Sequence, residues 1–487
     1  MKLEELKNKK ILIVGRGIEG NAAHKYLHKH LPSSIIDIVD QKDGISYLDK
    51  QTSYDIAIKS PGVKPELIKI PYTTSTNIFL ANSRGKVIGV TGTKGKSTTS
   101  TLIYKMLKKE GLDAYFGGNI GQSSLDFLDK LNDHSWTVLE MSSFQLQDVK
   151  LSPHIAVMLM IGEEHLDYHK TYEEYIDAKR NIFRFQTPSD FAIINRDYLA
   201  SHGSDTYTKG KVFNISRERE VGEGCFVKQG KVVVRSMGAL RSLRQFGDSS
   251  NRILKQPSSL ALANASKHGS RDSLFKSAPH AEAPRALLST PVDEEVIDIK
   301  YILLPGKHNL ENVCAAVMAA TIAGVSREAI RKVLSEFSGL EHRLEFVKDV
   351  NGIRFYNDSL ATIPQATIEA LEALPQTETL IAGGHDRGID YRPLAQYLRN
   401  GQVKTLILFP PTGIRIWEEI CKVVSESSRP GKFDVKTMEQ AVKIAFVETL
   451  PGKICLLSSA SASFGIFKDY KDRGEQFKRE VASLMSS

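Results

Sequence analysis

Short apolar runs rich in β-branched residues recur along the chain, and most of them end in a glycine-rich or polar turn. Runs of this kind are typical of strands buried on both faces of a parallel sheet. Segments with helical periodicity follow several turns, at residues 21–28, 101–109, 171–185 and 364–374. The predicted strands are residues 10–14, 35–39, 55–59, 87–91, 137–140, 155–161, 191–195, 211–215, 353–356, 380–382, 405–409 and 454–457. This alternation predicts an α/β fold.

The pattern divides the chain into three predicted domains, residues 1–86, 87–339 and 340–487. Residues 225–234 predict a hairpin with a Gln-Gly turn, and residues 297–304 resume the fold after an interruption. The interruption, residues 235–291, is rich in Ser, Ala, Arg and Lys and has no sustained period. We expect it to be a disordered or poorly packed insertion, with a small helical subdomain as the alternative.

Composition narrows the class of protein. The chain is 41% hydrophobic and 25% charged, as expected of a soluble globular protein. It has neither a run of about 18 apolar residues nor a signal-peptide pattern at its start, so we expect no membrane association. The four cysteines are far apart, which favours a reducing cytoplasm over disulfides or a zinc site. The net charge of +8 is spread along the chain, which favours a solvated surface or a preference for anionic substrates over nucleic acid.

Residues 92–99, GTKGKSTT, lie between a predicted strand and a predicted helix. Glycines at such a junction let backbone N–H groups point into one concavity, and the helix N-terminus adds positive potential. Lys96 is placed to reach the outer phosphates of a nucleotide, and Ser97 can offer a hydroxyl to Mg2+. The loop is shorter than the common GxxxxGKS spacing, and a plain tight turn with an exposed lysine pair is the alternative.

A second glycine-rich turn, GRGIEG at residues 15–20, follows the first predicted strand. Asp40 ends the next strand, at the position where an acidic residue commonly binds a ribose. The motif alone leaves three alternatives open: a nicotinamide cofactor, another nucleotide such as a uridine nucleotide, or a structural turn.

Polar residues also gather at the ends of other predicted strands. Glu140 ends a strand beside the phosphate loop, where a carboxylate can hold Mg2+. Residues 162–169 form a dense ionisable cluster that suits metal or phosphate chemistry. Asn309 and Asn312 share one helix face and could read a nucleobase edge, although plain helix capping is the simpler interpretation. Small polar residues end the strands of the third domain, where a small anion would bind.

Taken together and in order, the motifs resemble those of the Mur ligases of peptidoglycan synthesis, and most closely the glutamate-adding branch. The resemblance covers nearly the whole chain except residues 235–291. Its motifs are GTKGKST, GGNIG, LEMSSFQL, EEHLDYH, PGKHNLEN, LEHRLE, NDS and SASF followed by FKDYKDRG. It implies an N-terminal Rossmann-like domain for the UDP-linked substrate, a central P-loop domain for ATP and a C-terminal Rossmann-like domain for the amino acid.

The resemblance also implies a reaction: ATP-dependent addition of glutamate to UDP-N-acetylmuramoyl-L-alanine through an acyl phosphate. The implied catalytic residues are Lys96, Lys179, His165 and Arg343. The implied ATP contacts are Gly92, Thr93, Lys94, Gly95, Lys96, Ser97, Thr98, Asn309, Asn312 and Arg343. The implied contacts of the UDP-linked substrate are Gly17, Ile18, Asp40, Ser60 and Asn119. The implied ligands of two Mg2+ ions are Ser97, Glu140, His165 and Lys179, the last matching the lysine that the family carbamylates.

The third domain departs from the family pattern. Leu360 stands where the family has a lysine near the amino-acid carboxylate, and Tyr470 replaces an expected Phe. We expect Arg387 to bind that carboxylate, with the remaining contacts from Ser359, Thr362, Ser463 and Tyr470. The departure leaves D-glutamate, the family default, and L-glutamate open. A folylpolyglutamate-synthase-like ligase and a non-catalytic nucleotide-binding relative are further alternatives. We expect a monomer that acts on small molecules.

Overall fold

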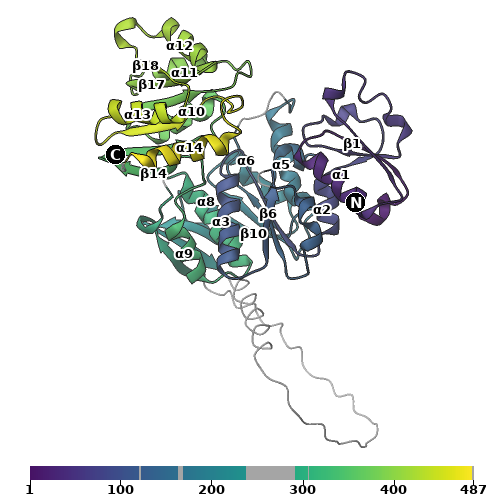
Figure 1. Ribbon diagram of the computed structural model, residues 1–487. Coiled ribbons are helices and arrows are strands. Elements are labelled where there is room, and N and C mark those ends of the chain that lie inside the picture. The colour runs from purple at the N-terminus through teal and green to yellow at the C-terminus, as the bar shows by residue number, and fades with distance from the viewer. Residues whose placement is uncertain (120–121, 163–167, 237–290, 305, 485–487) are drawn as a thin grey trace, which may run out of the picture. The chain divides into compact units, whose positions relative to one another are not determined.

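The computed structural model describes residues 1–119, 122–162, 168–236, 291–304 and 306–484. The chain forms two compact units, Met1–Tyr301 with His308–Leu334 and Ile302–Lys307 with Ser335–Ser487. In the described ranges the strands form three sheets, two in the first unit and one in the second. Figure 1 shows the helices and strands of each unit, coloured in chain order from purple to yellow. The predicted α/β class is confirmed, while the limits of the three domains stay a prediction.

The first sheet is parallel and has the order β2-β1-β3-β4. Its central strand, β1, is buried at residues 11–14, so the turn after it lies at the middle of the sheet edge. The helix after that turn begins earlier than predicted because Gly17 takes the extended conformation of an N-cap. The elements are β1 (Lys10–Val14), α1 (Ile18–His30), β2 (Ile35–Val39), β3 (Ile56–Lys59), β4 (Tyr72–Thr73) and α2 (Ser75–Asn82).

The second sheet has the order β13-β12-β11-β10-β9-β8-β5-β7-β6 and is parallel from β6 to β11. Its strands are β5 (Lys86–Thr91), β6 (Ala114–Gly118), β7 (Trp136–Glu140), β8 (Ile155–Met158), β9 (Phe191–Asn195), β10 (Lys211–Ser216), β11 (Gly224–Lys228), β12 (Lys231–Ser236) and β13 (Val292–Asp298). Its helices are α3 (Lys96–Lys109), α4 (Ser143–Leu146), α5 (Tyr172–Arg184), α6 (Leu199–His202), α8 (Asn309–Ile322) and α9 (Arg327–Glu336). One apolar core joins the first two sheets, since residues of α1 and α5 belong to the same buried cluster.

The predicted hairpin is confirmed as the antiparallel pair β11 and β12. Gln229 and Gly230 at its tip both have positive φ, as a two-residue turn that follows the sheet twist requires. The strand β13 pairs with β12, so the segments flanking the predicted insertion do adjoin. The fold resumes at Val292, before the predicted residue 297, and β13 ends at Asp298 in a 3-10 turn. Most of the predicted insertion, residues 237–290, lies outside the described residues.

Helix α8 is buried along nearly its whole length. It packs against α3 and against β9, β10 and β11, which explains why its sequence is rich in alanine and valine. A helix of 14 residues is too short to cross a bilayer, which takes about 20 residues. Throughout the described ranges, no helix is both long and apolar enough to be a membrane span.

The third sheet has the order β14-β15-β19-β16-β17-β18, parallel except for β14. Alternate residues of its strands belong to two separate apolar clusters. Helices α10, α11 and α12 complete one cluster and α13 and α14 the other, so the sheet is covered on both faces. The elements are β14 (Glu345–Val350), β15 (Ile353–Asp358), α10 (Pro364–Ala373), β16 (Thr377–Gly383), α11 (Arg392–Leu398), β17 (Thr405–Phe409), α12 (Thr412–Val423), β18 (Gly431–Asp434), α13 (Met438–Glu448), β19 (Ile454–Ser458) and α14 (Tyr470–Ser483).

Two edge strands, β14 and β18, were not predicted. Their sequences, EFVKDV and GKFD, mix charged and apolar residues, and most of their positions are only partly buried. An edge strand pairs on one side only and does not need the continuous apolar run that marks a central strand. The prediction therefore found the central strands and missed these edges.

Candidate active site

The phosphate loop lies as predicted between β5 and α3, with the helix beginning at Lys96. The Lys96 ammonium folds back over the loop, and its Nζ donates to the carbonyl oxygens of Gly92 at 2.8 Å and Thr93 at 2.7 Å. Lys94 is exposed and Thr98 is buried. The loop therefore combines a helix N-terminus with a fixed cation, which is the arrangement that binds phosphate.

Gly95 is the N-cap of α3 and has φ of +84°, a left-handed conformation that glycine adopts without strain. A Cβ at this position would lie 2.1 Å from Oδ1 of Asn312, so the α8 side chain fills the space that glycine leaves. Asn312 Nδ2 donates to Oδ1 of Asn309 at 2.9 Å. The structure thus brings both asparagines to the phosphate loop. Asn309 is the first residue of α8 and His308 is its N-cap, so simple capping by Asn309 is wrong.

Glu140 ends β7 and is buried beside the loop. Its Oε2 accepts from Ser97 Oγ at 2.7 Å and its Oε1 accepts from Asn119 Nδ2 at 2.8 Å. A buried carboxylate next to a hydroxyl offers hard oxygen donors, which suits Mg2+. Asn119, predicted to contact the UDP-linked substrate, therefore lies next to the candidate metal ligand.

Lys179 is buried on α5, and its Nζ donates to the carbonyl oxygen of Gly92 at 2.9 Å. The ammonium lies 4.5 Å from the centroid of the Tyr175 ring, and the Tyr175 hydroxyl is 2.9 Å from Oγ1 of Thr93. A lysine on a helix is most often surface charge, so this burial against the loop is what assigns Lys179 to the site. His165, also predicted here, lies outside the described residues.

The predicted contacts of the UDP-linked substrate gather at the carboxyl ends of β1, β2 and β3. Asp40 accepts from the backbone N–H groups of Arg16 at 2.7 Å and Lys42 at 3.1 Å, and these hydrogen bonds hold the pKa of Asp40 below its usual range. Ser60 Oγ donates to the carbonyl oxygen of Gly15 at 3.2 Å. Ile18 is 70% exposed at this edge, which suits an apolar contact with a ligand.

Glu19, in the first turn of α1, was not singled out from the sequence. Its Oε1 accepts from Gln145 Nε2 at 2.5 Å, while Oε2 is buried and has no hydrogen-bond partner among the described residues. Burial raises the pKa of Glu19 to about 7, against the opposing effects of the Gln145 hydrogen bond and the Lys59 charge. The carboxyl group therefore titrates near neutral pH.

In the second unit, Ser359 follows β15 and Ser463 follows β19. The loop that carries Arg387 lies beside the segment after β19, because His385 N donates to Ala462 O at 2.8 Å and the Arg387 guanidinium is 5.6 Å from the Phe464 ring. Thr362 and Tyr470 are half-buried, and Leu360 is 37% exposed. The structure thus brings Arg387 near Ser463, while Leu360 offers no cation.

Arg473 was missed in the sequence and is completely buried on α14. Its Nε donates to Ser359 Oγ at 2.9 Å, Nη2 to Ser359 O at 2.8 Å and Nη1 to Ser461 O at 3.1 Å. Burial lowers the pKa of Arg473 to about 10 and raises the pKa of the neighbouring Asp358 to about 7. This guanidinium fixes the two loops that carry the predicted amino-acid contacts.

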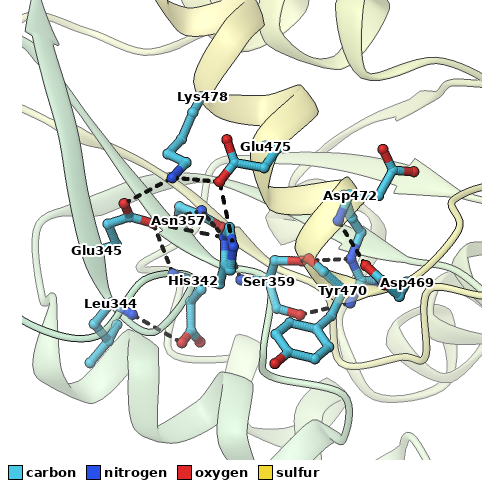
Figure 2. A network of polar contacts seen from close by, with 12 residues as sticks. His342, Leu344, Glu345, Asn357, Ser359, Asp469, Tyr470, Asp472, Glu475 and Lys478 are labelled. Atoms are coloured by element: carbon cyan, nitrogen blue, oxygen red, sulfur yellow. Dashed lines mark hydrogen bonds and ion pairs between the residues drawn. The ribbon is translucent and has the colours of Figure 1, made fainter. Parts of the chain in front are cut away.

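Arg343 is exposed in a tight turn whose neighbours, His342 and Leu344, both have positive φ. Figure 2 shows what holds the turn: His342 is buried among polar groups from β14, β15 and α14. Its Nδ1 lies 2.9 Å from Asn357 Nδ2, and its Nε2 lies 3.6 Å from a carboxylate oxygen of Glu475. Burial lowers the pKa of His342. The buried imidazole anchors the turn that carries the exposed Arg343.

A phosphate loop after a parallel strand, with a buried carboxylate and a buried lysine beside it, is typical of an α/β enzyme that uses a nucleoside triphosphate. Residues 90–233 match the Mur ligase middle domain, and residues 342–461 match the Mur ligase glutamate ligase domain. The chain belongs to the Mur ligase family, whose members are ATP-dependent ligases. This confirms the resemblance that the motifs predicted.

Curated relatives cover almost the full chain. It is 32% identical over 512 residues to the UDP-N-acetylmuramoylalanine–D-glutamate ligase of Acetivibrio thermocellus, which covers 99% of this chain and 98% of that protein. It is 36% identical over 441 residues to the ligase of the same name from Geobacillus kaustophilus, covering 88% of this chain and 84% of that protein.

Solved structures show the same fold at low sequence identity. The UDP-N-acetylmuramate–alanine ligase MurC of Thermotoga maritima has a TM-score of 0.53 at 14% identity, covering 98% of this chain and 100% of that chain. MurF of Acinetobacter baumannii has a TM-score of 0.53 at 17% identity, covering 91% of this chain and 88% of that chain.

The contact between Gly95 and Asn312 predicts the effect of a single methyl group. We expect Gly95→Ala to weaken ATP binding by at least about tenfold, or 1.4 kcal/mol, because the Cβ displaces Asn312. Gly111→Ala is the matched control, since Gly111 has φ of +85° and a Cβ added there would meet no described atom within 4 Å. Titration calorimetry with ATP measures both. Equal affinities for the two variants would contradict the prediction.

The raised pKa of Glu19 predicts a pH-dependent stability. A carboxyl whose pKa is 4.5 in the unfolded chain and about 7 in the folded chain favours folding at low pH, and this contribution is lost as pH rises through 7. We therefore expect Glu19→Gln to melt like the native protein at pH 4.5 and at a higher temperature than it at pH 8. Glu66→Gln, at an exposed carboxylate, is the control. Melting curves that differ equally at both pH values would contradict it.

Proposed function

We propose that this protein is the ATP-dependent ligase that adds glutamate to UDP-N-acetylmuramoyl-L-alanine in peptidoglycan precursor synthesis. The observation that carries the proposal is the group of Lys96, Ser97, Glu140 and Lys179 around one phosphate loop, in a chain with near full-length relatives named for this reaction. D-glutamate is the amino acid in the relatives' name. We also propose that it acts as a monomer in the cytoplasm.

The reaction begins when the alanine carboxylate of the UDP-linked substrate attacks the γ-phosphorus of ATP and ADP leaves. The amine of glutamate then attacks the carbonyl carbon of the acyl phosphate, inorganic phosphate leaves, and the amine gives up its proton. Lys96 binds the phosphate oxygens and Arg343 stabilises the transferring phosphoryl group, because catalysis of phosphoryl transfer rests on positioning and charge. Asn309 and Asn312 contact the adenine of ATP.

The residues beside the loop fit Mg2+, since Glu140 and Ser97 supply oxygen donors and a carbamate on Lys179 would supply more. When bound, Mg2+ neutralises negative charge on the phosphate oxygens. We propose two such ions, with His165 as a further ligand, and a carbamate on Lys179. A protonated lysine cannot ligate a cation, so the modification would change the sign of the charge at this position.

For the amino-acid substrate, Arg387 pairs with a carboxylate of the incoming glutamate. The remaining contacts of the amino-acid site come from Ser359, Thr362, Ser463 and Tyr470. Leu360 motivates a second candidate substrate, L-glutamate, since a changed carboxylate contact can change the accepted enantiomer. The two candidates share every step of the chemistry and differ only in this pocket.

We expect phosphate release from ATP in the presence of UDP-N-acetylmuramoyl-L-alanine and D-glutamate, and a loss of at least about a hundredfold in Lys96→Ala because a cation that stabilises the transition state is removed. Lys109→Ala, at an exposed lysine that ends helix α3, is the control. Release with L-glutamate alone would select the second candidate. Release with neither enantiomer, or full activity of Lys96→Ala, would overturn the proposal.

The carbamate predicts a signal that does not depend on turnover. We expect a carbamate carbon resonance when the protein is incubated with 13C-labelled bicarbonate, and its loss in Lys179→Gln. Lys130→Gln, at an exposed lysine, is the control and should keep the signal. A spectrum of the native protein without this resonance would leave Lys179 as an unmodified cation and contradict the prediction.

A further inference from the structure

A four-residue turn at positions 60–63, Ser-Pro-Gly-Val, follows β3 at the edge where the UDP-linked substrate is proposed to bind. Ser60 Oγ donates to the carbonyl oxygen of Gly15, so the turn is tied directly to the first glycine-rich loop. The space at Gly15 is limited, because a Cβ there would lie 2.7 Å from Ser60 Oγ. The position of this turn therefore sets the width of one side of the proposed substrate site.

Lys59, the last residue of β3, lies beneath the turn with none of its surface exposed. Its Nζ donates to Val63 O at 2.9 Å and to Ser60 O at 3.3 Å, so one ammonium group holds the carbonyl groups at both ends of the turn. Turns leave backbone carbonyls without partners, and a buried carbonyl must find a donor. Lys59 supplies two such bonds from inside the protein.

The charge of Lys59 is balanced by the segment that follows α4. Lys59 Nζ lies 2.9 Å from Oδ2 of Asp148, whose side chain is 8% exposed. Asp148 also accepts from the Tyr72 hydroxyl at 2.8 Å, and its backbone carbonyl accepts from Asn77 Nδ2 at 2.8 Å. Burial and this carboxylate raise the pKa of Tyr72, so the phenol remains a donor. Asp148 thus links the segment that follows α4 to β3, β4 and α2.

A second contact reaches the turn from the same side. The Tyr168 hydroxyl lies 3.2 Å from Val63 O and 3.3 Å from Pro61 O, and it accepts from Gln147 Nε2 at 2.7 Å. A phenol has one proton, so it donates to one of these carbonyls at a time. Gln147 precedes Asp148, so one short segment after Glu140, the candidate metal ligand, contacts both side chains that reach the turn, Tyr168 and Lys59.

We propose that Lys59 is a positioning residue for the UDP-linked substrate: through its ion pair with Asp148, it fixes the turn at residues 60–63 against the glycine-rich loop. This inference rests on the proposed function and adds to it the residue that sets the shape of the substrate site. Lys59 does not touch the substrate, since it is wholly buried. It acts through the Ser60 and Val63 carbonyls, and the ion pair couples the turn to the segment after Glu140.

The test separates positioning from simple stabilisation by two variants. Lys59→Met leaves Asp148 buried and unpaired, so it lowers the melting temperature as well as loosening the turn. In the double variant Lys59→Met/Asp148→Asn no unpaired charge remains, and we expect most of the melting temperature to return. In both variants the turn lacks the two hydrogen bonds that Lys59 donates. Lys69→Met, at an exposed lysine in the loop before β4, is the matched control.

We expect both variants to raise the KM for UDP-N-acetylmuramoyl-L-alanine by about tenfold or more while the KM for ATP stays within about twofold, with Lys69→Met unchanged. Hydrogen exchange of residues 60–63 should be faster in both. If the double variant regains the native KM together with its melting temperature, Lys59 serves folding only and the inference is overturned. An equal rise in the KM for ATP overturns it as well.

Calorimetric titration with UDP-N-acetylmuramoyl-L-alanine, without ATP or glutamate, keeps this inference apart from the proposed reaction. Binding by the native protein and weaker binding by both variants would support the role of Lys59 even where no glutamate is added, which would overturn the proposed function alone. Native affinity in both variants would overturn the role of Lys59 alone. The absence of binding by the native protein would overturn both.

Discussion

The carbonyl oxygen of Gly92 accepts hydrogen bonds from two lysines, Lys96 and Lys179, and the whole phosphate site depends on this meeting point. Strand β5 delivers the carbonyl, α3 delivers Lys96 and α5 delivers Lys179. Two ammonium groups next to one backbone oxygen repel each other, and the proposed carbamate on Lys179 would remove this repulsion. Glu140 and Ser97 complete the site on the side of β7, where we propose that they supply oxygen ligands to Mg2+.

A second regularity is that the loops carrying the predicted site residues are held by buried polar side chains. His342 anchors the turn that presents Arg343, Arg473 fixes the loop of Ser359, and Lys59 fixes the turn of Ser60. Loops at the carboxyl ends of strands have carbonyl groups that no ladder satisfies, and buried side chains with several N–H donors are well suited to satisfy them. Each of these buried side chains fixes the backbone of an irregular loop at the end of a strand.

The difference from the family pattern at Leu360 concerns the pocket proposed for the amino acid's carboxylate. A position that carries a cation elsewhere in the family is here a partly exposed leucine, and the cation of the same region is Arg387, beside Phe464. A guanidinium binds a carboxylate through two parallel hydrogen bonds, whereas a lysine offers a point charge. If Arg387 binds the amino acid's carboxylate as we propose, moving and changing the cation alters the direction from which that carboxylate is held, and this direction can select the enantiomer. The chemistry at the phosphate loop is untouched by the change.

The sequence by itself determined the α/β class, the central strands, the hairpin with its Gln-Gly turn and both glycine-rich loops, because these features follow from local periodicity and from residues adjacent in the chain. Only the tertiary structure placed Lys179 against Gly92, 87 residues away, and Asn312 against the phosphate loop. It alone revealed Glu19, Lys59, His342 and Arg473 as buried polar groups, and it alone showed the edge strands β14 and β18. A charged residue, or an edge strand that mixes charged and apolar residues, has the sequence pattern of an exposed segment. Whether such a residue is buried, or such a strand is paired, is decided by which distant segments the packing brings together.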